Sequence, residues 1–311
     1  MADLTPRIPR IALTVGDPAG IGPEIVVAAS ASEAVRAVCT PVIFGPHTPD
    51  DLAAFAPGGV SAAGGQSAYD TLIAAVKAVE RGEVDAIATG PLSKAAFAAA
   101  GLHWKGHTDL LAHLTGAPHV AMMFYSEPLR VVLATVHVPL RDVSALLTTP
   151  LLVSLIELTH RSLPQFGYPN PRIAVAGLNP HAGEHGLMGA EDDAVIAPAV
   201  AQCRAHGIDV VGPMPGDTVF LRAVRGAFDV VVATYHDQGL IPIKLLAFGS
   251  SVNVTLGLPL VRTSVDHGTA FDIVGKGLAD ASSMVSAVTL AARLVLARRA
   301  TPDLPESQTG T

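Results

Sequence analysis

Three short apolar segments, each typical of a buried strand, run into a histidine a few residues later. They are Arg130–His137, Arg172–His181 and Asp229–His236. In an α/β domain, ligands collect outside the carboxyl ends of parallel strands, so three imidazoles delivered there could converge on one point. Imidazole binds Zn²⁺ and related divalent ions, and three protein ligands with one open position are typical of a catalytic metal site. Each histidine could instead cap its strand and hydrogen-bond a loop, but the repetition at three matching strand ends favours a metal site.

A second candidate is an anion site at Gly106-His107-Thr108-Asp109, just before a predicted helix that ends at Gly116. Backbone N–H groups and the dipole at a helix start favour anions, so the imidazole and hydroxyl could hold a phosphate. The simpler interpretation of these four residues alone is an ordinary N-cap by Thr108. For these four residues alone we favour the N-cap.

Two cations, Lys244 and Arg262, occur within otherwise apolar sequence, with Asn253 between them. A buried cation needs an anion, which could be an internal carboxylate or a bound phosphate or carboxylate. We favour a bound ligand. Asp237, directly after His236, could orient the imidazole or accept a proton.

Two glycine-rich loops are candidates for contact with a cofactor. Gly16–Glu24 follows the predicted strand Ile11–Val15 and precedes a helix, but its spacing matches neither a Rossmann fingerprint nor a Walker A motif. It could equally be a tight strand–helix turn. Ser264–Gly277 combines a histidine with several glycines and resembles a loop that binds a flat or polyphosphate ligand.

Strand and helix patterns alternate along the whole chain, which predicts an α/β fold with mostly parallel sheets covered by helices. No break in composition marks a linker, so we expect the chain to cross more than once between any two domains. Further predicted strands are Val42–Phe44 and Asp85–Thr89, and predicted helices run from Ser67 to Gly82 and near residues 149–163, 191–206 and 283–299.

The composition excludes several classes of protein. The 311 residues are 50% hydrophobic with 29 glycines, which is typical of a globular α/β enzyme. The net charge is −7 without a basic stripe, so we expect no nucleic-acid partner. No stretch approaches about 18 apolar residues, so we expect no membrane span. Cys39 and Cys203 lack metal-type spacing and indicate reduced thiols in a soluble, cytoplasmic protein.

Together these motifs resemble the 4-hydroxythreonine-4-phosphate dehydrogenase (PdxA) family of pyridoxal phosphate biosynthesis, within the isocitrate/isopropylmalate dehydrogenase-like fold. The similarity extends over nearly the whole chain. The segments that carry it are Gly16–Glu24, Gly106–Thr108, His137–Asp142, Gly177–Glu184, Tyr235–Gly239, Val252–Pro259 and Arg262–Ala270.

The resemblance implies roles for individual residues. The implied metal ligands, for zinc or alternatively Mg, Mn or Co, are His137, His181 and His236. The implied substrate-binding residues are His107, Thr108, Lys244, Asn253 and Arg262. By similarity to the NAD loops of the wider fold, the implied cofactor-binding residues are Gly16, Asp17, His267, Gly268, Thr269 and Asp272. The best candidates for the catalytic base are Asp237 and Asp217.

The resemblance also implies the domain organisation and assembly. Residues 1–128 and 257–300 would form a discontinuous NAD-binding subdomain, and residues 129–256 a metal-binding and dimerisation subdomain. Both would be α/β/α layers with the active site in a cleft. Residues 301–311 would be a mobile tail. The family works as a homodimer, so we expect His236 to complete a site built mainly by a second copy.

The activity implied is an NAD-dependent, metal-assisted oxidation with decarboxylation of 4-hydroxythreonine 4-phosphate in the cytoplasm. A sister activity, a 3-dehydrogenase of 4-phosphothreonate or 4-phosphoerythronate, remains open. A metal-dependent phosphosugar isomerase or aldolase would need the histidines without NAD. A phosphorylated-metabolite binding protein without redox activity would need only the cations. The loop from Asp266 to Gly277 favours the dehydrogenase, since the other classes do not need it.

Overall fold

The computed structural model describes residues 7–300 and divides the chain into two compact units. Unit 1 is built from the chain up to Pro118 and from Leu258 onward, and unit 2 is His119–Gly257. The chain therefore leaves unit 1, completes unit 2 and returns. The predicted mobile tail, residues 301–311, lies outside the described residues.

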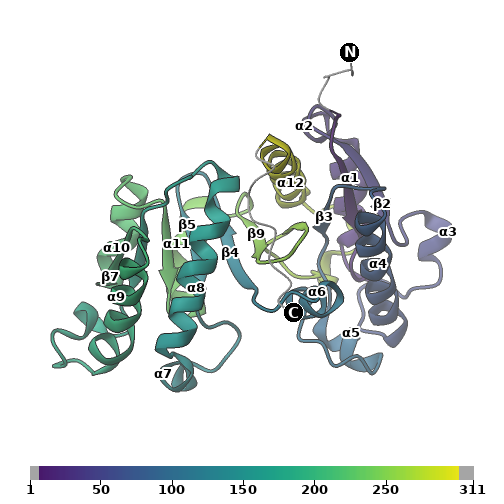
Figure 1. The fold of residues 1–311 in the computed structure, drawn as a ribbon. Coiled ribbons are helices and arrows are strands. Elements are labelled where there is room, and N and C mark those ends of the chain that lie inside the picture. The colour runs from purple at the N-terminus through teal and green to yellow at the C-terminus, as the bar shows by residue number, and fades with distance from the viewer. Residues whose placement is uncertain (1–6, 301–311) are drawn as a thin grey trace, which may run out of the picture. The chain divides into compact units, whose positions relative to one another are not determined.

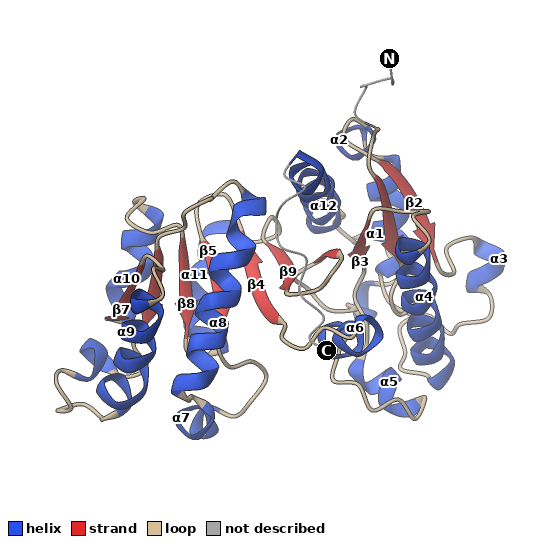
Figure 2. Ribbon diagram, in the orientation of Figure 1, coloured by secondary structure: helices blue, strands red, loops and turns tan. Residues whose placement is uncertain are grey.

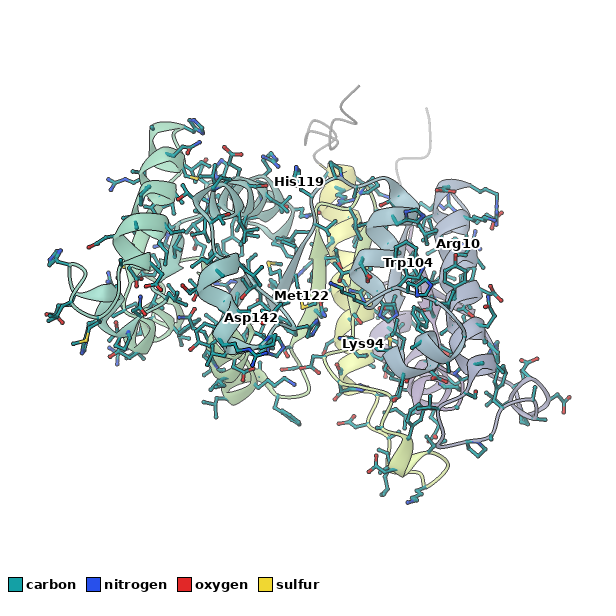
Figure 3. The ribbon with its side chains drawn as sticks, turned by 90° about the horizontal axis from the view of Figure 1, so that it is seen from below. Arg10, Lys94, Trp104, His119, Met122 and Asp142 are labelled. Atoms are coloured by element: carbon teal, nitrogen blue, oxygen red, sulfur yellow. The ribbon has the colours of Figure 1, made fainter. Side chains whose placement is uncertain are left out.

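The first unit boundary lies earlier in the chain than residue 128, where the sequence analysis placed it. The reason is β4 (Ala121–Tyr125), which pairs antiparallel with β5 (Arg130–Leu133) and with β9 (Val252–Leu256). A strand hydrogen-bonded on both sides within one sheet belongs to that sheet. His119 and Met122, labelled in Figure 3, are therefore part of unit 2.

The sheet of unit 1 has parallel strands in the order β2-β1-β3-β10. Residues of β1 and β3 are buried on both faces, as expected for a parallel sheet that helices cover on both sides. The strands are β1 (Arg10–Thr14), β2 (Thr40–Phe44), β3 (Ala86–Thr89) and β10 (Val261–Ser264).

Helices cover both faces of this sheet (Figures 1 and 2). On one face α1 (Gly22–Ala31) packs against α12 (Ser282–Ala300), and on the other α4 (Ala62–Glu80) packs against α5 (Lys94–Ala99). Shorter elements are α2 (Glu33–Arg36), α3 (Pro49–Leu52), α6 (His107–Thr115) and a 3-10 turn, Phe271–Ile273.

The predicted start of the long helix at Ser67 is wrong. Helix α4 begins at Ala62, and the Ser61 side chain caps it by accepting a hydrogen bond from Gly64 N at 3.0 Å. Two glycines lie near its start, and a Cβ at Gly65 would lie 2.1 Å from the Ala96 carbonyl oxygen. Glycine is present there because α4 and α5 approach closely.

The sheet of unit 2 has the order β9-β4-β5-β8-β6-β7, in which β5, β8, β6 and β7 are parallel. Its other strands are β6 (Ile173–Ala176), β7 (Val210–Met214) and β8 (Val230–Ala233). The predicted α/β fold with mostly parallel strands is confirmed, and within unit 2 β4 runs antiparallel to both of its neighbours.

Helices also cover the sheet of unit 2. One pair is α8 (Thr149–Ser162) with α9 (Ala197–Ala205), and the other strand-packed helices are α10 (Gly216–Val224) and α11 (His236–Ala247). Buried side chains of β5, β8, α10 and α11 form one apolar cluster. Shorter elements are α7 (Val143–Leu146), a π-helical turn (Asp192–Ile196) and 3-10 turns at Leu140–Asp142, Leu163–Phe166 and Pro180–Gly183.

Within residues 7–300, no single helix is long and apolar enough to cross a bilayer. One pair, Leu140–Leu146 with Thr149–Phe166, would reach that length and composition, but it is bent by 89°.

Candidate active site

The three histidine-bearing loops leave three adjacent parallel strands at the same edge of the unit 2 sheet. The loop to His137 follows β5, the loop to His236 follows β8, and the loop to His181 follows β6. The strand order β5-β8-β6 places the three loops side by side. Sequence alone predicted the strand ends, and the topology makes them neighbours.

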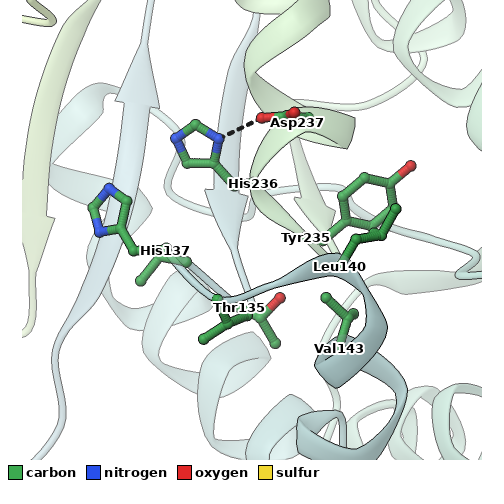
Figure 4. A pocket seen from close by; sticks show the side chains of 9 residues that line it. Thr135, His137, Leu140, Val143, Tyr235, His236 and Asp237 are labelled. Atoms are coloured by element: carbon green, nitrogen blue, oxygen red, sulfur yellow. Dashed lines mark hydrogen bonds and ion pairs between the residues drawn. The ribbon is translucent and has the colours of Figure 1, made fainter.

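Two of the histidines lie close together in a surface pocket (Figure 4). The ring centroids of His137 and His236 are 5.5 Å apart, with the rings tilted by 41°. Zinc–imidazole bonds of about 2.1 Å and tetrahedral angles place two coordinated rings roughly 5 Å apart. The spacing of this pair therefore fits two ligands of one ion.

His181 lies in the 3-10 turn Pro180–Gly183 and is exposed. Both His181 and His137 have positive φ angles, 53° and 44°, so their directions are set by an unusual backbone. In residues 7–300 of one chain, no three His, Cys, Asp or Glu side chains are gathered closely enough to hold a metal ion. The three-histidine site, which the sequence analysis assigned to two copies, stays a prediction.

The carboxylate of Asp237 accepts a hydrogen bond from the imidazole of His236 (Figure 4). Its Oδ1 lies 2.7 Å from His236 Nδ1. With Nδ1 protonated, the lone pair of the neutral ring is on Nε2, the atom available to a ligand. The geometry favours the orienting role for Asp237. The other proposed base, Asp217, is exposed in the first turn of α10.

The loop of His181 is held by a carboxylate that the sequence analysis did not identify. Asp192 is fully buried and accepts hydrogen bonds from Leu178 N at 2.9 Å, Asn179 N at 3.1 Å and Asn179 Nδ2 at 3.0 Å. Three donors on one buried carboxylate fix the backbone just before His181. The acidic run Glu191-Asp192-Asp193 carried no visible signal of this role.

In unit 1, a buried cation lies beside the predicted phosphate-binding histidine. Arg262 is 2% exposed, and its Nη2 donates to Thr89 Oγ1 at 2.7 Å. Burial lowers the pKa of Arg262 to about 9. Burial, and then the charge of Arg262, hold the pKa of His107 well below its ordinary value. A bound anion would offset both effects, because it favours positive charge.

The interpretation of Thr108 as an ordinary N-cap is wrong. The N-cap of α6 is Gly106, without a side-chain cap, and His107 and Thr108 form the first turn. Thr108 therefore lies in the first turn of α6, where the free backbone N–H groups of a helix start favour an anion.

A cation missed by the sequence analysis lies next to this helix start. Lys94 is the first residue of α5 and is exposed; a Cβ at Gly106 would lie 4.0 Å from its Cε (Lys94 is labelled in Figure 3). Its signal was weak, because Ser93-Lys94 reads as an ordinary N-cap followed by a surface lysine.

The remaining two predicted substrate residues are in unit 2. Lys244 is exposed on α11, so the assumption that it is a buried cation is wrong, whereas it holds for Arg262. Asn253, on β9, has a buried Oδ1 with no hydrogen-bond partner among the described residues. Such an atom is suited to a ligand donor.

The two glycine-rich loops predicted to bind the cofactor are joined in unit 1. Ile21 N donates to the Thr269 carbonyl at 2.9 Å, and a Cβ at Gly20 would lie 2.8 Å from the same oxygen. Gly16 has φ 71°, and a Cβ there would lie 2.0 Å from the Pro91 carbonyl oxygen. Glycine is therefore needed for these close approaches of backbone.

The side chains of these loops differ in their access to a ligand. Asp17 is fully buried: its Oδ1 accepts from Ala19 N at 3.0 Å, and burial raises its pKa. His267 has a buried Nε2 with no hydrogen-bond partner among the described residues, which suits a ligand contact. Gly268 is exposed, and so is Asp272, within the 3-10 turn after Ala270.

The chain matches the model of the family described as pyridoxal phosphate biosynthetic protein PdxA over residues 24–291. It is 46% identical to the 4-hydroxythreonine-4-phosphate dehydrogenase of Beijerinckia indica, over 91% of this chain and 94% of that protein. It is 43% identical to the D-threonate 4-phosphate dehydrogenase of Cupriavidus necator, over 94% and 98%.

A solved structure gives the same result for the fold. The crystal structure of 4-hydroxythreonine-4-phosphate dehydrogenase from Klebsiella pneumoniae superposes with a TM-score of 0.84 and 42% identity, covering 92% of this chain and 99% of that one. The predicted family resemblance and the predicted dehydrogenase class are both confirmed. The chain belongs to the PdxA family and is a dehydrogenase.

Proposed function

We propose that this dehydrogenase uses NAD and a divalent metal ion to oxidise, with decarboxylation, a phosphorylated threonine-like substrate, 4-hydroxythreonine 4-phosphate. The observation that carries the proposal is the exit of three histidine-bearing loops from adjacent parallel strands at one edge of the sheet. We propose that the ligands are His137, His181 and His236. The ion, zinc or alternatively Mg, Mn or Co, would supply a Lewis acid for a substrate hydroxyl.

The chain's own residues would bind and orient the substrate. Arg262, His107 and Thr108 would bind its phosphate, because a buried guanidinium and a helix start together favour an anion. Lys244 and Asn253 are proposed to contact the substrate as well. Asp237 would hold the His236 ring, and Asp217 remains a candidate to take a proton.

The cofactor would lie against the two joined loops of unit 1. Close backbone contact at Gly16 and Thr269, the exposed Gly268 and the unpartnered His267 Nε2 support this location. Asp272 is proposed as a polar contact. Because Asp17 is buried, we propose that it shapes the loop instead of touching the cofactor. NAD would accept the hydride that leaves the substrate carbon.

The sister activity on D-threonate 4-phosphate remains the second candidate, because a relative of that name is nearly as similar as those named for hydroxythreonine phosphate. The phosphate-binding residues serve both substrates equally. The dehydrogenase class disfavours the isomerase or aldolase and the binding protein without redox activity.

The decisive experiment is a substrate panel. Purified protein is given 4-hydroxythreonine 4-phosphate, 4-phosphothreonate or 4-phosphoerythronate, with NAD⁺ or NADP⁺ and Zn²⁺ or Mg²⁺, while absorbance of the reduced cofactor is followed. We expect the highest kcat/KM with the first substrate and NAD⁺. A preference for 4-phosphothreonate or 4-phosphoerythronate would show that the sister activity is the correct one. No reduction of NAD⁺ or NADP⁺ with any of the three substrates would overturn the proposal.

We propose that the protein acts as a homodimer. Helix α11 exposes Ile241 and Leu245, at 60% and 81%, one turn apart on the same face, and Phe248, directly after the helix, is 82% exposed. The helix begins at His236 and carries Lys244, so a second copy covering these side chains would also meet the proposed site. A cytoplasmic location belongs to the same proposal, supported by two buried, free cysteines.

Mixing two inactive variants tests the shared site. If His236 completes the site of a second copy, a mixture of His137→Ala and His236→Ala chains restores one of two sites in each mixed dimer. Random pairing makes about half of the dimers mixed, so recovery approaches roughly a quarter of wild-type activity. No recovery after verified subunit exchange would place all three ligands on one chain.

A further inference from the structure

A chain of side-chain hydrogen bonds connects the three histidine-bearing loops of unit 2. Thr135 Oγ1 donates to the Thr234 carbonyl at 2.8 Å. Thr234 N and Oγ1 both donate to Gln238 Oε1, at 2.7 and 2.9 Å. Gln238 Nε2 donates to the Gly177 carbonyl at 2.7 Å.

Each link acts a short distance before a histidine. Thr135 precedes His137 by two residues, Thr234 precedes His236 by two, and Gly177 opens the loop to His181. The network therefore contacts every loop at its base, where a small displacement would move the imidazole at its tip.

The network begins where the sheet ends. The ladder between β5 and β8 closes at Leu133 and Ala233, with one further backbone bond from Ala134 N to the Ala233 carbonyl. Beyond that point, the Thr135 hydroxyl supplies the next connection, to Thr234. Thr234 is fully buried and Thr135 is 6% exposed, so water competes little for the bond between them.

Both the oxygen and the nitrogen of the Gln238 side-chain amide are needed for its hydrogen bonds. Its Oε1 faces two donors and its Nε2 faces a carbonyl acceptor, so the amide must both accept and donate. A glutamate can accept from Thr234 but cannot donate to Gly177 when ionised. The neighbouring Gly216 leaves room for this amide: a Cβ there would lie 3.2 Å from Nε2.

We propose that Thr135, Thr234 and Gln238 are positioning residues that hold the three histidine-bearing loops of one chain in register, so that His137 and His181 meet one divalent ion and His236 meets the ion of the second copy. This inference rests on the proposed function, because it takes His137, His181 and His236 as the ligands. Outer contacts of this kind set ligand direction, and their loss weakens metal affinity by about 10- to 100-fold.

The test uses Co²⁺ as the probe, because its visible absorption reports ligand geometry. Wild type, Gln238→Glu, Thr135→Val and Thr135→Ser are titrated with Co²⁺, and Tm is measured for each without metal. The matched control is Thr159→Val, which removes a hydroxyl that donates to the Leu155 carbonyl at 2.7 Å in the buried face of α8.

We expect Gln238→Glu and Thr135→Val to bind Co²⁺ about tenfold or more weakly, with altered band intensities. Thr135→Ser should retain affinity, because it keeps the hydroxyl. Thr159→Val should lose stability but not affinity. Wild-type affinity in both network variants, or losses matched by Thr159→Val at equal Tm, would overturn the positioning role. Absence of stoichiometric Co²⁺ binding by wild type would instead overturn the metal site itself, and this inference with it.

Discussion

The two clusters proposed to act on the substrate are built in opposite ways. In unit 1, Arg262 is 2% exposed beside His107 within one unit. In unit 2, the His236 and Asp237 side chains are 40% and 75% exposed. The first cluster is buried within its own unit. The second is held at the base of its loops, but its side chains are exposed to solvent. Completion by a second copy is therefore expected of the histidine edge, and substitutions should separate the two clusters.

The largest effect is expected at the open cluster. His181→Ala should lower kcat by about a thousandfold or more, because a lost ligand removes the Lewis acid at the substrate oxygen. Steady-state kinetics with the best substrate of the panel measures it. The control is His185→Ala, an exposed histidine of the same loop with φ 55°. Equal losses in both variants would point to loop damage and not to a ligand role.

The enclosed cluster should respond more weakly. Arg262→Lys keeps the charge but loses the planar fork, so kcat/KM should fall by about 10- to 100-fold, largely through KM. Arg130→Lys is the matched control: Arg130 is 7% exposed, and its guanidinium donates to the Asp229 and Glu127 carbonyls. It should lower Tm with little change in KM. Unchanged kinetics in Arg262→Lys would assign Arg262 a purely structural role.

A smaller effect concerns pH. Because the pKa of His107 is depressed in the folded state, the unfolded chain binds more protons as pH falls below about 6.5. Above that pH, His107 makes no pH-dependent contribution to the free energy of unfolding. Below it, the free energy of unfolding falls progressively, because the unfolded chain takes up the proton. Urea unfolding at a series of pH values should show this dependence flattened in His107→Gln. His103→Gln, at an exposed histidine, should leave it intact; the reverse pattern would contradict the assignment.

The smallest effect is expected at Lys94, an exposed cation. Lys94→Ala should raise KM only a few-fold, and the difference should shrink at high salt, because exposed charges are screened. Kinetics at low and high ionic strength measure it. Lys77→Ala, an exposed lysine on α4, should leave KM unchanged. A rise that persists in high salt would indicate direct contact with the substrate.

Local patterns predicted the fold and the positions of the candidate ligands. Apolar runs identified β5, β6 and β8, and each histidine follows its strand within a few residues, so no distant contact was needed. The cation pair shows the limit. Lys244 and Arg262 have similarly apolar neighbours in sequence, yet Lys244 lies on an exposed helix face and Arg262 within a sheet covered by helices. Hydrophobic neighbours alone do not distinguish the two.

Contacts between distant segments could not be predicted. Thr135 and Thr234 are 99 residues apart, and Gln238 and Gly177 are 61 apart. Their hydrogen bonds exist only because β5, β8 and β6 are neighbours in the sheet. Thr, Gln and Gly are common at strand ends and carry no signal alone. Likewise, the glycines at the start of α4 indicate a loop until the approach of α5 is known.

The positive φ angles of His137 and His181 have a consequence for how this protein would evolve under selection. A side chain held in the left-handed region costs about 1–2 kcal/mol relative to glycine. Selection for thermal stability alone would therefore favour glycine or asparagine at these two positions, and the resulting variants would be more stable but would lack two of the proposed metal ligands. Among relatives that have lost the activity, residues 137 and 181 are where such replacements should accumulate first.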